Sequence, residues 1–338
     1  MIDSRKIKDF AKQIGMDVRI ASAIPFAKEA EEIRKQRSNG LFLNDKYWSD
    51  KDIDKFCNPA SALSNAKSII SSFLFYLTED EPDPSKSGRP FGLVARYTQR
   101  NYYKELKRRL KKLAGLLKKE YPANYVVHAC GPIAEKPIAQ RSGIGYYGKH
   151  SVIINPRYGS WIVLGEIITD LEVEPDRPLD IDCGKCKKCM DACPTGAIIE
   201  PYVIDRKKCI QSLTNHLDII PDEIARVWSN RLYGCTTCQD VCPVNRKVKP
   251  EPPKTEIGIV GAYVPLIDIL QMDEKTYRHR YADNQITARW INFEAIKRNV
   301  LIALGNIKDR RTIDLIKKFT KSRSKTLKET ATWALNQF

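Results

Sequence analysis

The spacing of the cysteines constrains this chain more than any other feature of its sequence. Residues 183–194 read CGKCKKCMDACP and residues 235–243 read CTTCQDVCP, while Cys209 stands alone between the two segments. Two-residue gaps let a tight loop wrap three corners of one 4Fe-4S cubane, whereas the three-residue gap followed by proline sends the fourth cysteine to the other cubane. The pattern predicts a ferredoxin-like module with two 4Fe-4S clusters.

This crossover divides the eight cysteines into two sets of ligands. The first cluster is predicted to take Cys183, Cys186, Cys189 and Cys242. The second cluster is predicted to take Cys193, Cys209, Cys235 and Cys238. Zinc is the competing interpretation, because paired C-x2-C units also form tetrahedral sites, but a zinc ribbon does not need the C-P ending twice. Two close cubanes pass single electrons, so we expect an external electron donor and a further redox centre.

The rest of the sequence is typical of a reducing compartment. Two of the ten cysteines, Cys57 and Cys130, lie outside the cluster motifs. No run of eighteen uncharged apolar residues occurs, and the first residues, MIDSRKIKDFAKQ, lack the apolar core of a signal peptide. We therefore expect a cytoplasmic monomer without membrane contact. A length of 338 residues suggests two or three domains.

The first part of the chain, residues 1–172, reads as a mixture of helices and strands in an α+β protein. The apolar run at 66–77 is typical of a buried strand. The short runs at 152–154 and 161–164, separated by the turn-forming NPRYG, are expected to pair as strands. The cluster motifs then occupy a second part, residues 173–247, which is inserted before the C-terminal part.

The third part, residues 248–338, begins with a proline-rich linker and continues with helical patterns. The segments LIAL at 301–304 and TWAL at 332–335 repeat at a spacing of thirty-one residues, which predicts a HEAT-like helical hairpin. Stacked helices of this kind bury one apolar stripe each and leave charged side chains in solvent. The side chains expected to face solvent are Lys317, Lys318, Lys321, Arg323, Lys325 and Lys328.

The formal net charge of +16 favours a polyanionic partner, because lysine and arginine release counterions from phosphates. Nucleic acid is the natural candidate. Charge alone leaves the alternative open that the lysines only keep the protein soluble. Residues 102–121 predict a basic amphipathic helix, and such a helix is more typical of a solvated face over a core than of a phosphate site.

Residues 143–148 match the pattern G-x-G-x-x-G, which in other settings cradles a dinucleotide pyrophosphate. Here the glycines are expected to follow a helix and precede a strand, whereas a Rossmann fold requires the opposite order. The segment therefore does not predict NAD or FAD binding.

Taken together, PIAEKPIAQRSGIGYYGKHS at 132–151, GSWIVLGEIITDLE at 159–172 and the two cysteine motifs resemble the epoxyqueuosine reductase family in order and spacing. The likeness is most specific between Pro132 and Pro243. It implies a cobalamin enzyme related to reductive dehalogenases, in which a nitroreductase-like domain holds the corrin and two 4Fe-4S clusters reduce its cobalt. Members convert epoxyqueuosine to queuosine in the tRNA anticodon loop with two electrons, two protons and loss of water.

The resemblance also implies individual site residues. By family position, corrin contacts come from Ile153 and Leu164 on two strands, and from Lys208 and His216 on either side of Cys209. Taken without the resemblance, Ile153 and Leu164 are more typical of strand core, and His216 is more typical of a helix surface.

The sequence departs from the family at the position of the proton donor. Family members carry an aspartate at the start of a D-S-A-P-type segment, and this chain has Ala129-Cys-Gly-Pro there. Alanine cannot transfer protons, so Cys130 and His128 are the candidate replacements, and a bound water is the alternative. Along a strand both side chains point away from the side that residue 129 faces, unless the strand has already ended.

A second departure is Asn101-Tyr-Tyr103, where the family commonly reads D-Y-H. Either Tyr102 or Tyr103 is then expected to offer the hydrogen bond. The leading hypothesis is a cobalamin-dependent iron-sulfur reductase acting on tRNA. The alternatives are a corrinoid paralogue with another substrate, a non-catalytic electron-transfer protein, and a tRNA-binding protein whose clusters are structural.

Overall fold

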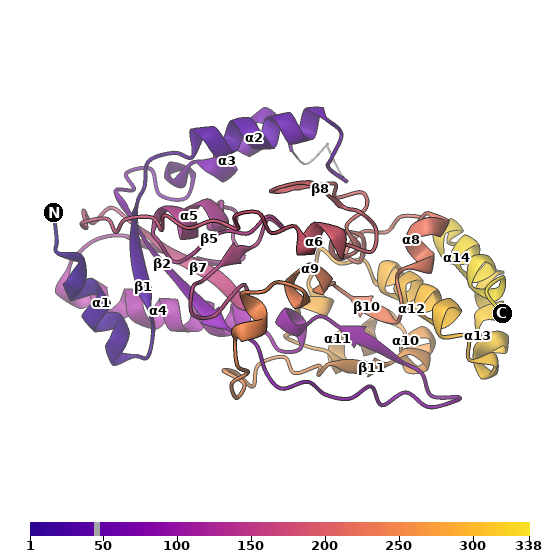
Figure 1. Ribbon diagram of the computed structural model, residues 1–338. Coiled ribbons are helices and arrows are strands. Elements are labelled where there is room, and N and C mark those ends of the chain that lie inside the picture. Colours follow the sequence, from indigo (N-terminus) through magenta and orange to yellow (C-terminus); the bar gives the residue numbers. More distant parts are fainter. Residues whose placement is uncertain (44–47) are drawn as a thin grey trace.

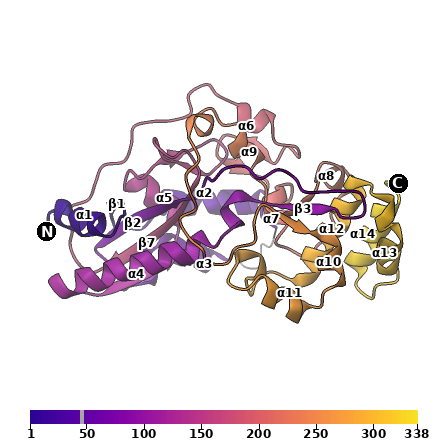
Figure 2. The ribbon, with the colours of Figure 1, turned by 90° about the horizontal axis from the view of Figure 1, so that it is seen from below.

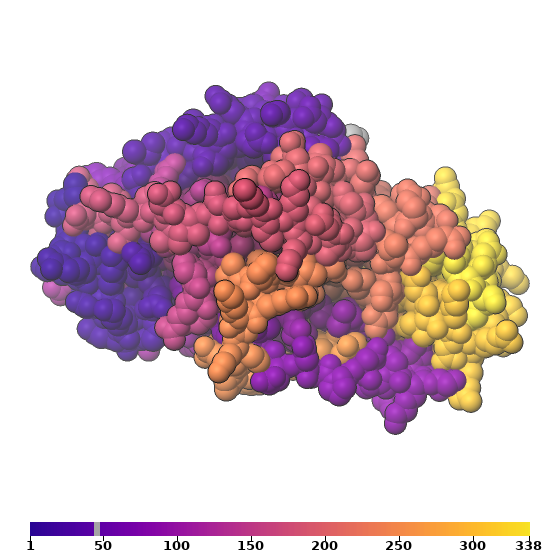
Figure 3. Space-filling view, viewed as in Figure 1, coloured from indigo at the N-terminus to yellow at the C-terminus, as the bar shows by residue number. Residues whose placement is uncertain are grey.

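The computed structural model describes residues 1–43 and 48–338, and it runs from an N-terminal α/β region at one end to helices at the other (Figures 1 and 2). The cluster motifs lie between these ends, as the rose and orange atoms of Figure 3 show. Within the described ranges, no helix has both the length and the apolarity needed to cross a membrane. Mixed helices and strands confirm the α+β class.

A four-stranded antiparallel sheet forms the centre of the N-terminal region, in the order β1-β2-β7-β4. Its strands are β1 (Val18–Ser22), β2 (Ser68–Phe75), β4 (Tyr125–Ala129) and β7 (Ile162–Thr169). The apolar run predicted as a buried strand is β2, which confirms that prediction. Both β2 and β7 are buried along almost their whole length because helices cover both faces of the sheet.

Five helices cover this sheet. Helices α1 (Ser4–Gln13) and α4 (Tyr102–Glu120) pack on the face that carries Ile70 and Ile167. The other face, with Ile69 and Ile168, packs against α2 (Ala27–Ser38), α3 (Asp50–Cys57) and α5 (Glu135–Arg141). The predicted basic helix is therefore α4, with four of its five leucines buried and all of its lysines exposed.

The expected pairing of residues 152–154 with 161–164 is wrong. Strand β6 (Ile153–Ile154) pairs instead with β5 (Tyr146–Tyr147), and β7 pairs with β2 and β4. The turn between the two runs contributes one isolated bridge, from Asn155 to Gly159. Every side chain of β7 is buried, because the strand lies between β2 and β4 in the large sheet. Pairing with the two-residue strand β6 would not cover so long a strand.

The cluster region consists of short elements joined by loops. Its helices are α6 (Lys188–Asp191), α7 (Ile210–Leu213), α8 (Asp222–Arg226) and α9 (Thr237–Asp240). Its strands are β8 (Ile198–Glu200), β9 (Val203–Ile204) and β10 (Arg231–Tyr233). Helices α6 and α9 are the short helices that follow the two C-x2-C loops, and they pack against each other.

The C-terminal region begins with β11 (Tyr263–Pro265) and continues with helices. These are α10 (Leu266–Gln271), α11 (Glu274–Arg280), α12 (Phe293–Ile307), α13 (Ile313–Phe319) and α14 (Lys325–Leu335). The two repeat segments lie in α12 and α14, which pack against each other and against α13. All six basic side chains that were expected to face solvent are exposed.

A second sheet links the three regions. Strand β3 (Phe91–Val94) lies between β10 and β11, parallel to the first and antiparallel to the second. Each of the predicted ranges 1–172, 173–247 and 248–338 thus contributes one strand. The ranges stay a prediction of domain boundaries, and the shared sheet indicates that their positions are fixed relative to one another.

Candidate redox site at the second cysteine set

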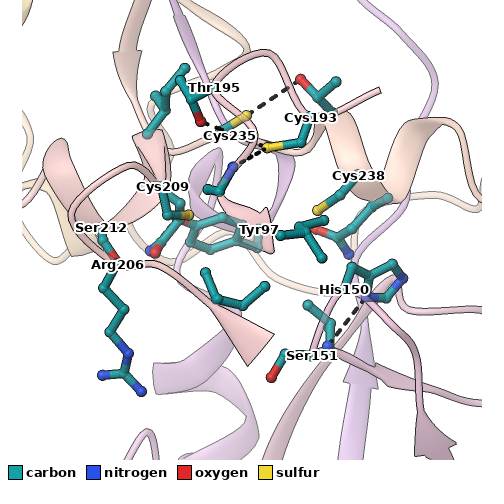
Figure 4. Close-up of a pocket in the computed structure, with 18 of the residues that line it drawn as sticks. Tyr97, His150, Ser151, Cys193, Thr195, Arg206, Cys209, Ser212, Cys235 and Cys238 are labelled. Carbon is teal, nitrogen blue, oxygen red and sulfur yellow. Dashed lines mark hydrogen bonds between the residues drawn. The ribbon is translucent and has the colours of Figure 1, made fainter. Parts of the chain in front are cut away.

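A cavity of about 430 Å³ lies between the N-terminal region and the cluster region. Residues after β5, in the first half of β7 and in α5 line one side, and the cysteine loops line the other (Figure 4). This volume lies within the range of small-molecule and cofactor pockets. The fold therefore brings the cysteine loops and the apolar first half of β7 to the same cavity.

The four cysteines of the second predicted set all line this cavity, as Figure 4 shows. They are Cys193, Cys209, Cys235 and Cys238. Burial raises the pKa of the Cys238 thiol well above its usual value, and the thiols of Cys235, Cys209 and Cys193 raise it further. Closely spaced buried thiolates repel one another unless cations lie among them, so this donor set fits an iron-sulfur cluster.

Hydrogen bonds already surround two of these sulfur atoms. The backbone N–H of Ala197 donates to Cys193 Sγ at 3.3 Å. The hydroxyl oxygens of Thr195 and Thr237 lie 3.7 Å from Cys193 Sγ and 3.4 Å from Cys235 Sγ. Hydrogen bonds to cluster ligands fix the ligands in place and adjust the reduction potential of the cluster. These contacts would have both effects on the second cluster.

The first predicted set gathers in a different place. Cys183 and Cys242 pack in one small apolar cluster with Tyr146 and Ile154. Burial raises the pKa of the Cys189 thiol, and the nearby thiols of Cys183 and Cys186 add to the effect. Among the described residues that line the cavity, none belongs to this set. The division of the eight cysteines into two sets of cluster ligands stays a prediction.

His150 is a cavity-lining residue that the sequence reasoning did not single out. Burial lowers its pKa to about 4, so the ring is neutral. Its Nδ1 accepts the backbone N–H of Val152 at 3.2 Å, which leaves the proton on Nε2. That N–H has no partner among the described residues, and leaving it so costs about 1–3 kcal/mol. An acceptor on a bound ligand would satisfy it.

Gly148 makes room for this ring. A Cβ at Gly148 would lie 2.6 Å from His150 Cε1 and 3.0 Å from Nε2. The last glycine of the G-x-G-x-x-G pattern therefore has a packing reason, and the pattern follows α5 and precedes β6 as the sequence predicted. The only signal that pointed to His150 was its place beside these glycines.

A buried polar network joins the second cysteine set to the N-terminal sheet. The amide of Gln239, next to Cys238, donates to Tyr76 Oη at 3.0 Å and to Ser160 Oγ at 2.9 Å. Asn245 Oδ1 accepts the Ser160 N–H at 2.7 Å, and its amide donates to Ser160 Oγ and to the Gln239 carbonyl oxygen, both at 2.8 Å. These buried bonds fix the cluster loops against the cavity.

The predicted corrin contacts lie close to the cavity without lining it, as far as the described residues show. Ile153 and Leu164 are buried in the main core, while their neighbours Val152 and Val163 line the cavity. Lys208 is exposed beside Cys209, with its amine 4.0 Å from an Asp205 carboxylate oxygen. Their role in cofactor binding stays a prediction.

His216 lies at the edge of the segment between Cys209 and Cys235. Burial lowers its pKa, and the charge of Arg298 also lowers it. Arg298 is fully buried and donates to the carbonyl oxygens of Leu213 and Asp218, both at 2.7 Å. This arginine connects α12 to the inserted segment. A contact of His216 with the corrin also stays a prediction.

The position of the missing acid lies at the end of β4. Ala129 pairs with Gly165, and His128 pairs with Glu166 of β7. Cys130 has a left-handed backbone with φ of 55°, so the strand has ended there and the alternation of strand side chains no longer applies. Although the residue is exposed, desolvation by the surrounding protein raises the pKa of the Cys130 thiol to about 11, and the charges of Glu135 and Glu166 add to the rise.

Of the two tyrosines at the second departure, Tyr103 lines the cavity and Tyr102 is buried in the core. Burial raises the pKa of Tyr103 well above its usual value, and Cys130 and Glu135 raise it further. The hydroxyl therefore stays protonated and available as a donor.

Comparison with known proteins gives these features a family. The model described as "Epoxyqueuosine reductase QueG, DUF1730" matches residues 57–130, and the model described as "4Fe-4S double cluster binding domain" matches residues 182–245. The epoxyqueuosine reductase of Bacillus anthracis is 35% identical over 339 residues, which cover 97% of this chain and 87% of that protein. The chain belongs to the epoxyqueuosine reductase family. The Escherichia coli (strain K12) member is 34% identical over 289 residues, with coverage of 82% and 75%.

Solved structures of the family share the whole fold. An epoxyqueuosine reductase bound to an epoxyqueuosine-modified tRNA stem loop superposes with a TM-score of 0.88 at 30% identity, covering 99% of this chain and 89% of that one. The Streptococcus thermophilus enzyme gives 0.89 at 28% identity, with coverage of 99% and 90%. As a family member with a double-cluster domain, this chain carries two 4Fe-4S clusters in residues 182–245.

Proposed function

We propose that this chain reduces epoxyqueuosine to queuosine in tRNA, with two 4Fe-4S clusters and cobalamin as cofactors. Family membership supports the activity. The observation that carries the proposal is the cavity into which the second set of thiols and the unpartnered Nε2–H of His150 both open. The eight cysteines serve as ligands in the two sets given above, and the second cluster lies beside the cofactor.

The cavity suits a cofactor rich in carbonyl and phosphate oxygens. Lys136 lines it, and its amine donates to the Ser151 carbonyl oxygen at 2.7 Å. Arg206 lines it as well, with its guanidinium 4.2 Å from the ring centre of Phe42. With the N–H of His150, these cations would bind the amide and phosphate groups of cobalamin, while Ile153 and Leu164 support the strands beneath. When bound, cobalamin supplies the low-potential metal centre that takes electrons from the clusters.

The chain's own residues have three tasks in this mechanism. The thiols of the second set hold their cluster at the cavity wall, and the Gln239–Ser160–Asn245 network keeps that wall in register with the N-terminal sheet. His150 orients the cofactor as a neutral donor. Tyr103, at the cavity lining, offers its hydroxyl toward the substrate side.

The finer fold assignment is also proposed. The N-terminal region acts as a nitroreductase-like cofactor domain, and the α12–α14 helices act as a HEAT-like unit that binds tRNA. The support is the exposed basic set of Lys317, Lys318, Lys321, Arg323, Lys325 and Lys328. Phosphate contacts of this kind give binding that weakens steeply with salt. The protein works as a cytoplasmic monomer that an external donor reduces.

One observation favours a second candidate, a corrinoid paralogue acting on another substrate. Ala129 carries no acid at the position where the family has its proton donor, and loss of general acid catalysis typically costs about a hundredfold to ten-thousandfold in rate. The paralogue would bind cobalamin and accept electrons but leave epoxyqueuosine tRNA unchanged.

The test is anaerobic reconstitution with iron, sulfide and cobalamin, followed by a reductant-driven assay on an epoxyqueuosine-containing stem loop. Queuosine should form, and a stem loop with unmodified guanine should stay unchanged. Bound cobalamin without turnover would favour the paralogue. Failure to bind cobalamin would overturn both enzyme proposals and favour an electron-transfer protein.

A further inference from the structure

Tyr97 is a cavity-lining residue that also contacts the cysteine loops. It lies in the short 3-10 helix directly after β3. The pairing of β3 with β10 brings it there, because the backbone N–H of Ala95 donates to the Tyr233 carbonyl oxygen at 2.9 Å. Figure 4 shows Tyr97 between Cys209 and Cys238. The N-terminal region therefore contributes one aromatic side chain to the wall that carries the second cysteine set.

The Tyr97 hydroxyl is bonded to the turn that follows Cys209. Gln211, two residues after this cysteine, donates its side-chain N–H to Tyr97 Oη at 3.2 Å. The hydroxyl of Thr214 donates to the Gln211 carbonyl oxygen at 2.9 Å. The turn is therefore fixed to Tyr97 through the side chain of Gln211 and to Thr214 through its backbone.

The same tyrosine lies against the backbone just before Cys235. A Cβ at Gly234 would lie 2.7 Å from Tyr97 Oη, and the φ of this glycine is 74°. Glycine tolerates this left-handed backbone, and its missing side chain leaves room for the tyrosine. The Gly234 N–H donates to Thr214 Oγ at 3.1 Å. Tyr97 and Thr214 therefore join the backbone beside Cys209 to the backbone beside Cys235, which the inserted segment separates in the sequence.

The far end of this network is anchored on α12. The Asn299 amide donates to the carbonyl oxygens of Thr214 and Leu232, at 3.1 and 2.9 Å. Asn299 and Thr214 are both fully buried, so water does not compete for these bonds. The two cysteine loops are thus held between Tyr97 and a helix of the C-terminal region.

The hydroxyl of Tyr97 also carries a dipole at the cavity wall. Gln211 is the one hydrogen-bond partner of Tyr97 Oη among the described residues, and the bond uses an oxygen lone pair rather than the phenol proton. A phenol keeps that proton at neutral pH. Hydrogen-bond donors around an iron-sulfur cluster change its reduction potential, because they stabilise the negative charge that reduction adds.

We propose that Tyr97 is a positioning residue for the second 4Fe-4S cluster, which holds the loops of Cys209 and Cys235 together and raises the reduction potential of that cluster. The inference rests on the ligand sets of the proposed function. Electrons move between two close clusters according to their potentials. Tyr97 therefore favours the electron on the cluster beside the cavity, where the cofactor takes it up.

The first arm of the test is a redox titration followed by electron paramagnetic resonance, on cluster-loaded protein without cobalamin or tRNA. Cys186→Ser and Cys238→Ser identify the signals of the first and second cluster. Tyr97→Phe keeps the ring and removes the hydroxyl. It should make reduction of the second cluster about tenfold less favourable, which is about 59 mV for one electron, and leave the first cluster unchanged.

Tyr125→Phe is the matched control, because it removes a hydroxyl that donates to the Tyr121 carbonyl oxygen at 2.9 Å, at the start of β4. This variant should change neither potential. A second-cluster potential that stays or rises in Tyr97→Phe would overturn the proposal. An equal shift of both clusters would overturn it as well, because it would mark a general effect on packing.

The second arm asks whether the effect passes through Gln211. Gln211→Met removes the same hydrogen bond, so the variant with both changes should shift the potential no further than Tyr97→Phe alone. Additive shifts would overturn the positioning role. Iron per chain is measured in every variant. Selective loss of the second cluster in Tyr97→Phe supports the positioning role, whereas loss of both clusters overturns it.

The titration separates this inference from the proposed activity. Failure to bind cobalamin or to form queuosine would overturn the proposed function and leave the titration result standing, since neither enters it. Full iron content in Cys238→Ser would overturn the ligand sets and the role of Tyr97 with them.

Discussion

The two walls of the cavity are assembled in different ways. The cluster wall is built largely from short loops in which the cysteines of each motif follow one another within a few residues, with Cys209 alone between the two motifs. The opposite side holds Lys136 of α5, His150 and Val163 of β7, which come together because α5 packs on the sheet beside β7. A metal cluster needs closely spaced ligands, whereas a cofactor pocket can gather single side chains from separate elements.

Removing one of the predicted cluster ligands should have the largest effect. In Cys238→Ser we expect loss of the second cluster, because one of its four thiolates is gone, and loss of detectable turnover. Iron per chain should fall to about half, with the first cluster's spectroscopic signal kept. Cys57→Ser is the matched control, since that thiol is buried in the α2–α3–α5 core outside both sets. Full iron content in Cys238→Ser would contradict the ligand assignment.

The carboxyl group of Glu135 should make the stability of the protein depend on pH. Since the pKa of Glu135 rises from 4.5 to about 7 on folding, the folded chain binds more protons between these values. The contribution of Glu135 to stability is therefore fully present below pH 4.5 and is lost as the pH rises through 7. Glu135→Gln should remove this loss, a difference on the order of 3 kcal/mol between pH 5 and 8.

The measurement is the unfolding midpoint of the cluster-loaded wild type and variant at both pH values, under anaerobic conditions. Glu120→Gln, at an exposed glutamate at the end of α4, serves as the control. Parallel pH profiles for wild type and Glu135→Gln would show that folding does not raise the pKa of Glu135.

The junction between the walls can be loosened at Asn245. Its side chain is 3% exposed and makes three hydrogen bonds to Ser160 and Gln239. Asn245→Ala leaves buried polar groups unsatisfied, so we expect a loss of about 2 kcal/mol in unfolding free energy and slower reduction of the bound cofactor. Denaturant unfolding and stopped-flow absorbance check these two effects. Asn336→Ala, at an exposed position, should change neither.

The smallest effect is expected at His150. His150→Ala should weaken cobalamin binding by about tenfold, since one buried hydrogen bond is lost. Because the pKa of His150 is about 4, wild-type affinity should not change between pH 6 and 8 through this group. An absorbance titration of the chain with cobalamin measures both. A loss as small as in the exposed control His279→Ala would remove His150 from the cofactor site.

Sequence patterns predicted some elements well and others poorly for physical reasons. The buried strand β2 and the basic helix α4 were predicted because a long apolar run and a helical stripe of leucines are each local signals. The pairing of β6 with β7 was predicted wrongly. The partner of a strand depends on which surfaces of the fold need covering, and the residues of the strand alone do not specify it. The shared sheet of β3, β10 and β11 left no local trace either.

The sequence by itself determined the family and the double-cluster motif, because metal-ligand spacing is a property of neighbouring residues. The tertiary structure decided the chemistry on the other side of the cavity. Only folding brings Lys136, His150 and Arg206 to one cavity and leaves the Nε2–H of His150 without a partner among the described residues. Burial and the company of distant groups set the protonation of these side chains, and neither exists until the chain has packed.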